Sequence, residues 1–325
     1  MTEVLLDVFN WINDTITGNF GLTIILFTFL LRVVCLPIDI YSRKGQRDYA
    51  IKTAAMKGEI DLINKAYKHD PQRQQQEIMA LRKKHGIGIM PKGCFSQLLV
   101  YPLLIAFFAV FRNMAALQIR ELSDLVAQYG PEHEVVTQWF NENSFLWIRN
   151  IWMPDNAIST SSIPVIRVIP FINFSDAIVP TGDYLTNNIL AGGGITDPDV
   201  AVAIRANMNQ LVNTGSYSGN NGWFILPVLS AVLQFFSMKI TTKLNPQTAA
   251  MDAADPQAAS SKKMSNTMNI IFPLLFAFFC FTSSSALAIY WVASSVIMTV
   301  FNVLIAKGLD WFDARKQPKA TATVK

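Results

Sequence analysis

Arg32 is the residue of this chain whose position most needs a chemical explanation. It lies in the otherwise apolar or weakly polar stretch 22–37, and its guanidinium stays charged at any accessible pH. Placing such a group at bilayer depth costs about 3 kcal/mol on insertion scales. Two explanations are open. Arg32 precedes Pro37 by only five residues, so its head group can reach the interface by snorkelling; alternatively, it lines a wet cavity and meets a charged substrate.

Uncharged polar side chains accompany Arg32 in the apolar stretches. Thr28 lies one helical turn before it on the same face, and Gln97, Gln234 and Tyr290 lie in other apolar stretches. Taken singly, each is explained by a hydrogen bond between helices, worth about 0.6 kcal/mol on average. Taken together with Arg32, they could line a half-open hydrophilic groove.

The elements that must position these side chains are those of a membrane protein. Of the 325 residues, 51% are hydrophobic, 15% are charged and 22 are phenylalanine. A membrane-spanning helix needs roughly 20 mostly apolar residues, and runs of about this length predict an all-α bundle of five transmembrane helices. We assign these helices to residues 20–40, 93–118, 223–243, 266–283 and 285–307. Serines 283–285 separate the last two helices, which form a tight hairpin.

Lysine and arginine predict the orientation. Segment 1–19 has none, segment 41–93 has twelve, segment 117–222 has four, the loop 239–266 has four and the tail from Lys307 has five. Because short cytoplasmic loops are enriched in these residues, we place the N-terminus outside and the C-terminus in the cytoplasm.

The segments between the predicted spans have different characters. Residues 1–19 are predicted to form an external amphipathic segment, 119–222 an external loop or lobe with an insert at 157–222, 244–265 a polar cytoplasmic loop, and 308–325 a basic cytoplasmic tail. Within the insert we predict a helix at 198–212.

Residues 41–92 predict a cytoplasmic helical hairpin. Apolar residues recur at nearly helical spacing before Asp70. Asp70 is a good N-cap and Pro71 suits the first position of a second helix, which Gly86 ends. The segment is either a solvated linker, since charge runs usually serve solubility, or a basic arm that meets lipid headgroups, the ribosome or an incoming chain.

The sequence lacks the motifs of several classes of protein, among them nucleotide-binding proteins, metalloproteases and proton-coupled transporters. There is no G-x-x-x-x-G-K-[ST] phosphate loop and no H-E-x-x-H, and the three histidines are scattered. No paired carboxylates were found within a predicted span, which argues against a proton-coupled transporter. An intramembrane enzyme would need a nucleophile and a base at bilayer depth. The three cysteines show neither zinc spacing nor a disulfide framework. We therefore expect no enzymatic activity, cofactor or metal.

A series of different short motifs occurs along the chain, spread over the five predicted spans and the hairpin. They are Asn19-Phe20-Gly21 with Thr28, Arg32 and Leu36-Pro37; Asp70-Pro71-Gln72; Gly93-Cys94-Phe95 with Pro102; Phe145-Leu146-Trp147-Ile148; Pro154-Asp155; Ile225-Leu226-Pro227; Pro273; and Tyr290-Trp291. Together they resemble the YidC-type membrane protein insertases of the YidC/Oxa/Alb family, which include mitochondrial and chloroplast relatives. The chain departs from the family at Val100, where a glutamine is frequent, at serines 283–285 and at Ser295, and the insert 157–222 has no counterpart.

The resemblance implies an insertase and chaperone of the bacterial cytoplasmic membrane that works without nucleotide hydrolysis. It implies a cytoplasm-open groove lined by Arg32, Thr28, Gln97, Gln234, Tyr290 and Trp291. The implied partners are nascent membrane proteins and membrane lipids, with the ribosome and the Sec translocon, and no specific nucleic-acid recognition is implied. We expect the insert 157–222 to be dispensable for insertion.

Overall fold

The structure, a computed structural model, describes residues 2–86, 100–157, 163, 195, 197–217, 219–244, 267, 270–281 and 283–316. These residues are mostly helical, and within them no β-strand forms; Phe145 and Ile148 make an isolated bridge. The all-α prediction is therefore confirmed for the described residues. Gln97, most of the insert, residues 245–265 and the end of the tail lie outside them.

The chain divides into two compact units, and its longest helices contribute to both. The first unit comprises residues 1–31, 102–234 and 273–294, and the second comprises residues 32–101, 235–272 and 295–325. In chain order the elements are α1 (Thr2–Ile12), the π-helical turn η1 (Asn13–Thr17), α2 (Phe20–Ala55), α3 (Lys57–Ala66), α4 (Pro71–Lys84), α6 (Val100–Tyr129), α7 (Glu134–Glu142), α8 (Pro198–Thr214), α9 (Ile225–Leu244) and α12 (Ser285–Lys316). A shorter apolar helix covers Ile270–Phe281.

Three of the described helices are long and apolar enough to cross a membrane. They are α2, α9 and the Ser285–Asp313 part of α12. The count of five spans stays a prediction. Helix α2 continues through Pro37 to Ala55, and α6 continues beyond residue 118 to Tyr129, so both are longer than the spans predicted from apolar runs. The helix predicted at 198–212 is confirmed as α8.

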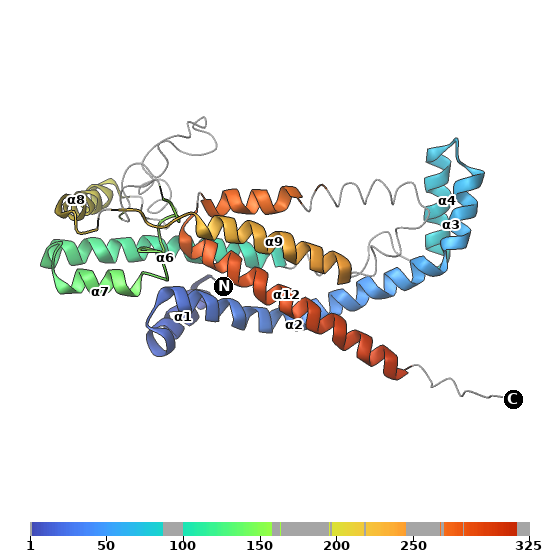
Figure 1. Ribbon diagram of the computed structural model, residues 1–325, viewed down its shortest axis with the longest axis horizontal. Coiled ribbons are helices and arrows are strands. Elements are labelled where there is room, and N and C mark those ends of the chain that lie inside the picture. The colour runs from blue at the N-terminus through green and yellow to red at the C-terminus, as the bar shows by residue number, and fades with distance from the viewer. Residues whose placement is uncertain are drawn as a thin grey trace. The chain divides into compact units, whose positions relative to one another are not determined.

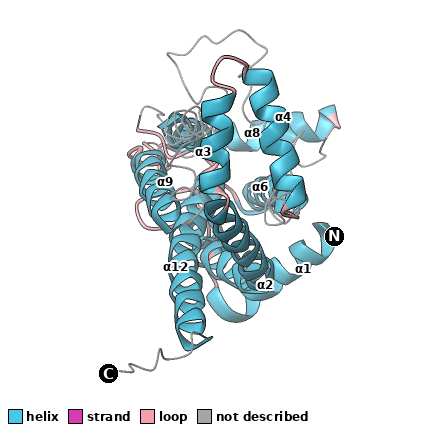
Figure 2. Cartoon of the chain, turned by 90° about the vertical axis from the view of Figure 1, so that its right-hand side faces the viewer, coloured by secondary structure: helices cyan, strands magenta, loops and turns pink. Residues whose placement is uncertain are grey.

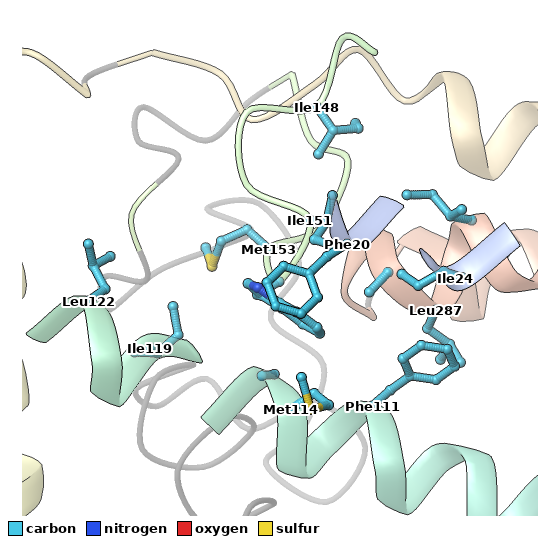
Figure 3. Close-up of a cluster of buried hydrophobic side chains, with 14 of the residues drawn as sticks. Phe20, Ile24, Phe111, Met114, Ile119, Leu122, Ile148, Ile151, Met153 and Leu287 are labelled. Carbon is cyan, nitrogen blue, oxygen red and sulfur yellow. The ribbon is translucent and has the colours of Figure 1, made fainter. Parts of the chain in front are cut away.

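The first unit packs around one apolar core. Helix α7 folds back along α6 (Figure 1), and Phe20 and Ile24 of α2 meet Phe111 and Met114 of α6 in the same buried cluster (Figure 3). The loop residues 148–153 and the start of α12 complete it. Burial of each large apolar side chain contributes about 1.5–3 kcal/mol relative to exposure, so this core is the main source of the unit's stability.

Helix α8, from within the predicted insert, belongs to this core. Its Ile204, Met208 and Leu211 are almost completely buried. Asn207 donates from Nδ2 to the carbonyl oxygen (3.1 Å) and the hydroxyl (2.9 Å) of Ser123 on α6. Deleting all of residues 157–222 would therefore expose an apolar surface on α6, so we expect it to destabilise the unit rather than remove an independent lobe.

A buried carboxylate ties the loop after α7 to the start of α9. Asp155 is fully buried, and its Oδ1 accepts hydrogen bonds from the backbone N–H of Trp223 (2.6 Å) and Phe224 (2.9 Å) while Oδ2 accepts one from Leu226 (2.7 Å). Backbone N–H groups at a helix start have no partner within the helix, and a negative charge there also interacts favourably with the helix dipole. Asp155 is therefore the cap of α9.

Two more polar side chains extend this connection. The buried Asn221 accepts a hydrogen bond from the N–H of Asn150 (2.8 Å) and donates to the carbonyls of Asn150, Met153 and Pro154. Ser285, the first residue of α12, donates from its hydroxyl (2.7 Å) and its N–H (2.8 Å) to the Met153 carbonyl. We call Asp155, Asn221, Ser285 and the backbone of residues 150–154 the Asp155 clasp; it joins the starts of α9 and α12 within the first unit.

Helices α3 and α4 of the second unit lie side by side and run in opposite directions (Figure 2). Met56, Ile60, Ile78 and Leu81 form their small buried cluster, and Gln74 donates to Asn64 across it at 2.6 Å. The turn between them has the predicted chemistry, because the Asp70 side chain accepts a hydrogen bond from the Arg73 N–H and Pro71 is the first residue of α4.

Replacing Ile78 with alanine should loosen the α3–α4 pair. Truncation of a buried isoleucine costs about 2–5 kcal/mol, which is large for so small a cluster. We expect hydrogen exchange of α3 and α4 amides to accelerate at least tenfold. Met79→Ala is the matched control, since the neighbouring side chain is 50% exposed and its loss should leave exchange nearly unchanged. Equal protection in the two variants would contradict the described packing.

Replacing Asp155 with asparagine should destabilise the first unit. The amide keeps the size of the side chain but offers one acceptor oxygen and no charge to three backbone donors, and each buried donor left unpaired costs about 1–3 kcal/mol. We expect a loss of about 3 kcal/mol, measured as a lower midpoint of thermal unfolding in detergent. Asp124→Asn, at an exposed position of α6, should leave the midpoint unchanged; similar midpoints for both variants would refute the role of the clasp.

Candidate functional site

Arg32 lies on a charged face of α2. At about 3.6 residues per turn, Thr28, Arg32, Asp39 and Arg43 fall within about 60° of one another around the helix. The exposed residues Leu30, Val34 and Tyr41 lie on the opposite side, with Val34 73% exposed. Helix α2 therefore presents one face with ionic groups and one apolar face, as expected of a helix that separates lipid from a polar environment.

Thr28 has its hydrogen-bonding group satisfied within the helix. Its side chain is 1% exposed, and its hydroxyl donates to the Ile24 carbonyl at 2.6 Å. Such a bond to the preceding turn is a common way for threonine to be accommodated in an apolar helix. In this structure Thr28 is therefore a packed residue of the first unit.

The aromatic pair at the start of α12 packs in the first unit. Tyr290 is buried, with its ring centroid 5.8 Å from that of Phe111. Trp291 is partly exposed and lies 4.5 Å from Phe276 and 6.3 Å from Phe108, measured between ring centroids. Aromatic pairs at these separations add about 0.5–1.5 kcal/mol beyond their burial, so the pair contributes to the packing of the apolar core.

The predicted site residues are thus divided between the two units. Thr28, Gln234, Tyr290 and Trp291 belong to the first unit, and Arg32 belongs to the second. Gln234 is partly buried on α9, and Gln97 lies outside the described residues. That these residues line a common groove stays a prediction.

Two further ionic residues on the same face of α2 as Arg32 were not identified from the sequence. Asp39 lies within the predicted span 20–40, and Arg43 had been counted only as a charge that sets orientation. Arg43 is 9% exposed, and both its Nη1 and the Oδ2 of Asp39 are shielded from solvent. Their spacing from Arg32, by seven and eleven residues, places them on its helical face and was the signal that could have identified them.

A further ionic contact joins α2 to α12 within the second unit. Arg47 contacts the carboxylates of Asp310 (2.7 Å) and Asp313 (3.1 Å). The aspartates are largely exposed, and an exposed ion pair contributes about 0–1 kcal/mol. The contact links the two helices but adds little to the stability of the unit.

Among the residues that the structure describes, no three His, Cys, Asp or Glu side chains gather in a way that could hold a metal ion. The ionic groups described above bind charge and do not form the nucleophile–base pair that covalent catalysis requires. The arrangement on α2 is thus suited to electrostatic attraction.

Comparison with known proteins identifies the family. The family model described as 60Kd inner membrane protein matches residues 11–311. Curated relatives named membrane protein insertase YidC include that of Chlorobaculum tepidum, 24% identical over 293 residues (90% of this chain, 33% of the relative), and that of Clostridium perfringens, 23% identical over 300 residues (92% and 82%). The relative from Chlorobaculum parvum is 31% identical over 155 residues.

The chain spans 22% of the Chlorobaculum parvum protein and 33% of the Chlorobaculum tepidum protein in these alignments. The family match nevertheless takes in Arg32, the α3–α4 pair and the whole Asp155 clasp. The chain belongs to the 60Kd inner membrane protein family.

Proposed function

We propose that this chain is a membrane protein insertase and chaperone, which moves hydrophobic segments of nascent proteins into the bacterial cytoplasmic membrane without nucleotide hydrolysis. Relatives over nearly its whole length are named membrane protein insertase YidC. The observation that carries the proposal is the position of Arg32, a permanent cation on one face of a helix that is otherwise apolar enough to cross a membrane.

The proposed topology has five spans with the N-terminus outside and the C-terminus in the cytoplasm. Three described helices qualify as spans, and α6 and the helix Ile270–Phe281 supply the other two. The distribution of lysine and arginine supports this orientation. The basic α3–α4 pair then lies in the cytoplasm, where it receives the incoming chain and meets lipid headgroups, the ribosome and the Sec translocon.

Arg32 acts in this proposal by lowering the cost of moving a charged tail. A carboxylate about 4 Å from a guanidinium gains about 1 kcal/mol in water and about 4 kcal/mol at an effective dielectric constant of 20. The attraction to Arg32 thus offsets part of the hydration free energy that an acidic tail loses when it leaves water. The Arg32 guanidinium is unchanged at the end of the step, so its contribution consumes no nucleotide.

Transfer of the apolar segment into lipid supplies the driving force. Removing apolar surface from water releases about 25 cal/mol for each Å², so a segment long enough to span the bilayer has a large favourable term. The insertase then needs only to lower the barrier for the polar tail, which is the role assigned to Arg32.

We propose that Arg32, Thr28, Gln97, Gln234, Tyr290 and Trp291 contact the substrate in a groove open to the cytoplasm. Thr28 and Tyr290 are buried in the packed first unit, so their contact requires local displacement of neighbouring side chains. Trp291 and Gln234 are partly exposed and can be reached with less rearrangement.

Replacing Arg32 with glutamate should block insertion of proteins with acidic translocated tails, because attraction becomes repulsion. We expect the yield in proteoliposomes to fall at least tenfold, equivalent to a barrier change of about 1.4 kcal/mol or more. Lys44→Glu is the matched control, since it makes the same charge reversal at an exposed position of α2. Equal yields for Arg32→Glu and wild type would refute the proposal.

Replacing Arg32 with lysine should preserve part of the activity. The charge remains, but the planar fork that binds a carboxylate through two parallel hydrogen bonds is lost. We expect a decrease of about threefold in initial insertion rate for acidic tails, and little change for a tail without charge. A lysine variant as inactive as Arg32→Glu would show that guanidinium geometry, rather than charge, is required.

A further inference from the structure

The carboxylate of Asp39 lies between two arginines along α2. Arg32 precedes it by seven residues and Arg43 follows it by four, which corresponds to about 10 Å and about 6 Å along the helix axis. Both guanidiniums act electrostatically on Asp39. The three groups therefore form an ordered series of positive, negative and positive charge on one helical face.

The central pair of this series has two shielded atoms that make no hydrogen bond, although Asp39 as a whole is partly exposed. Oδ2 of Asp39 and Nη1 of Arg43 are both inaccessible to solvent and make no hydrogen bond within the described part of the chain. Arg47, one turn further along, contacts Asp310 at 2.7 Å. Asp39 Oδ2 and Arg43 Nη1 make no such directional bond.

A carboxylate that lacks such hydrogen bonds can be displaced from its arginines by a competing anion. Breaking a buried, fully hydrogen-bonded pair leaves groups unpaired and costs several kcal/mol, whereas atoms that are already unpaired lose no hydrogen bond when a competing anion arrives. An incoming carboxylate can offer a guanidinium two well-directed hydrogen bonds. It would therefore form hydrogen bonds that Asp39 Oδ2 does not make in the structure.

We propose that Asp39 is a displaceable counter-ion of Arg32 and Arg43, and that it sets how strongly this chain prefers acidic over uncharged translocated tails. The inference rests on the proposed insertase function and adds a residue that determines its specificity. When Asp39 is present, the negative charge of a substrate competes with it for the arginines. When it is absent, the same face of α2 attracts acidic tails more strongly and repels basic ones.

The test measures insertion into proteoliposomes of one substrate whose translocated tail carries no charge, four aspartates or four lysines. Asp39→Asn is expected to raise the ratio of acidic-tail to uncharged-tail insertion about threefold to tenfold, and to lower the corresponding ratio for the lysine tail. Asp48→Asn is the matched control, because it removes a carboxylate from an exposed position of the same helix and should leave both ratios at wild-type values.

A second variant separates a role in specificity from a role in packing. The double substitution Asp39→Asn with Arg43→Gln removes both charges, so no uncompensated charge remains at position 43. If Asp39 also acts on Arg32, the double variant retains a raised acidic-to-uncharged ratio. A return to the wild-type ratio would show that Asp39 serves Arg43 alone and would overturn the inference. The double variant decides the question even if Asp39→Asn does not fold.

Measuring the Arg32→Glu variant in the same assay separates a failure of the proposed insertase function from a failure of the proposed role of Asp39. If Arg32→Glu inserts acidic tails as well as wild type does, the proposed function itself fails. If Arg32→Glu is impaired while Asp39→Asn keeps the wild-type ratio, the function stands and only the role of Asp39 is overturned.

Discussion

The carboxylate of Asp155 is the interaction on which the order of the first unit depends. It accepts hydrogen bonds from three backbone N–H groups at the start of α9, and Asn221 and Ser285 connect the same loop to the approach to α9 and to α12. Gly222 has to lack a side chain, since a Cβ there would collide with the carboxylate. The apolar core supplies most of the stability of the unit, but these polar contacts determine where two of its long helices begin.

The sequence predicted the helical class and the individual helices better than the contacts between them. The helix 198–212 and the Asp70 cap depend on neighbouring residues, so local spacing and turn chemistry were sufficient. The bonds from Asp155 to the start of α9 join residues 68 to 71 positions apart, and periodicity carries no information about such pairs. The family resemblance named Pro154-Asp155 as a motif without indicating which backbone groups the carboxylate would bind.

Arg32 could be identified from the sequence because its cost in an apolar helix is evident without a structure. Asp39 and Arg43 could not be assigned in the same way, since the charge count treats them as residues at the end of a span. The burial of Arg43 and the shielding of Asp39 Oδ2 depend on how the chain packs around α2. Thr28 was also selected for its polarity, and the structure adds that its hydroxyl is bonded to the preceding turn; its place in a groove stays a prediction. The polarity of a residue in an apolar helix makes it a candidate for contact with a substrate, and the packing around it determines how much of it is exposed.

Pro37 weakens α2 at one point, although the helix is continuous there. The proline ring has no N–H to donate to the carbonyl four residues earlier, at Val33, so α2 lacks one of its internal bonds at this point. A helix bends most easily where such a bond is missing. Pro37 lies between Arg32 and Asp39, so the missing bond falls within the series of charges on α2. A bend at this point would change the distance from Arg32 to Asp39 without breaking any other bond of the helix.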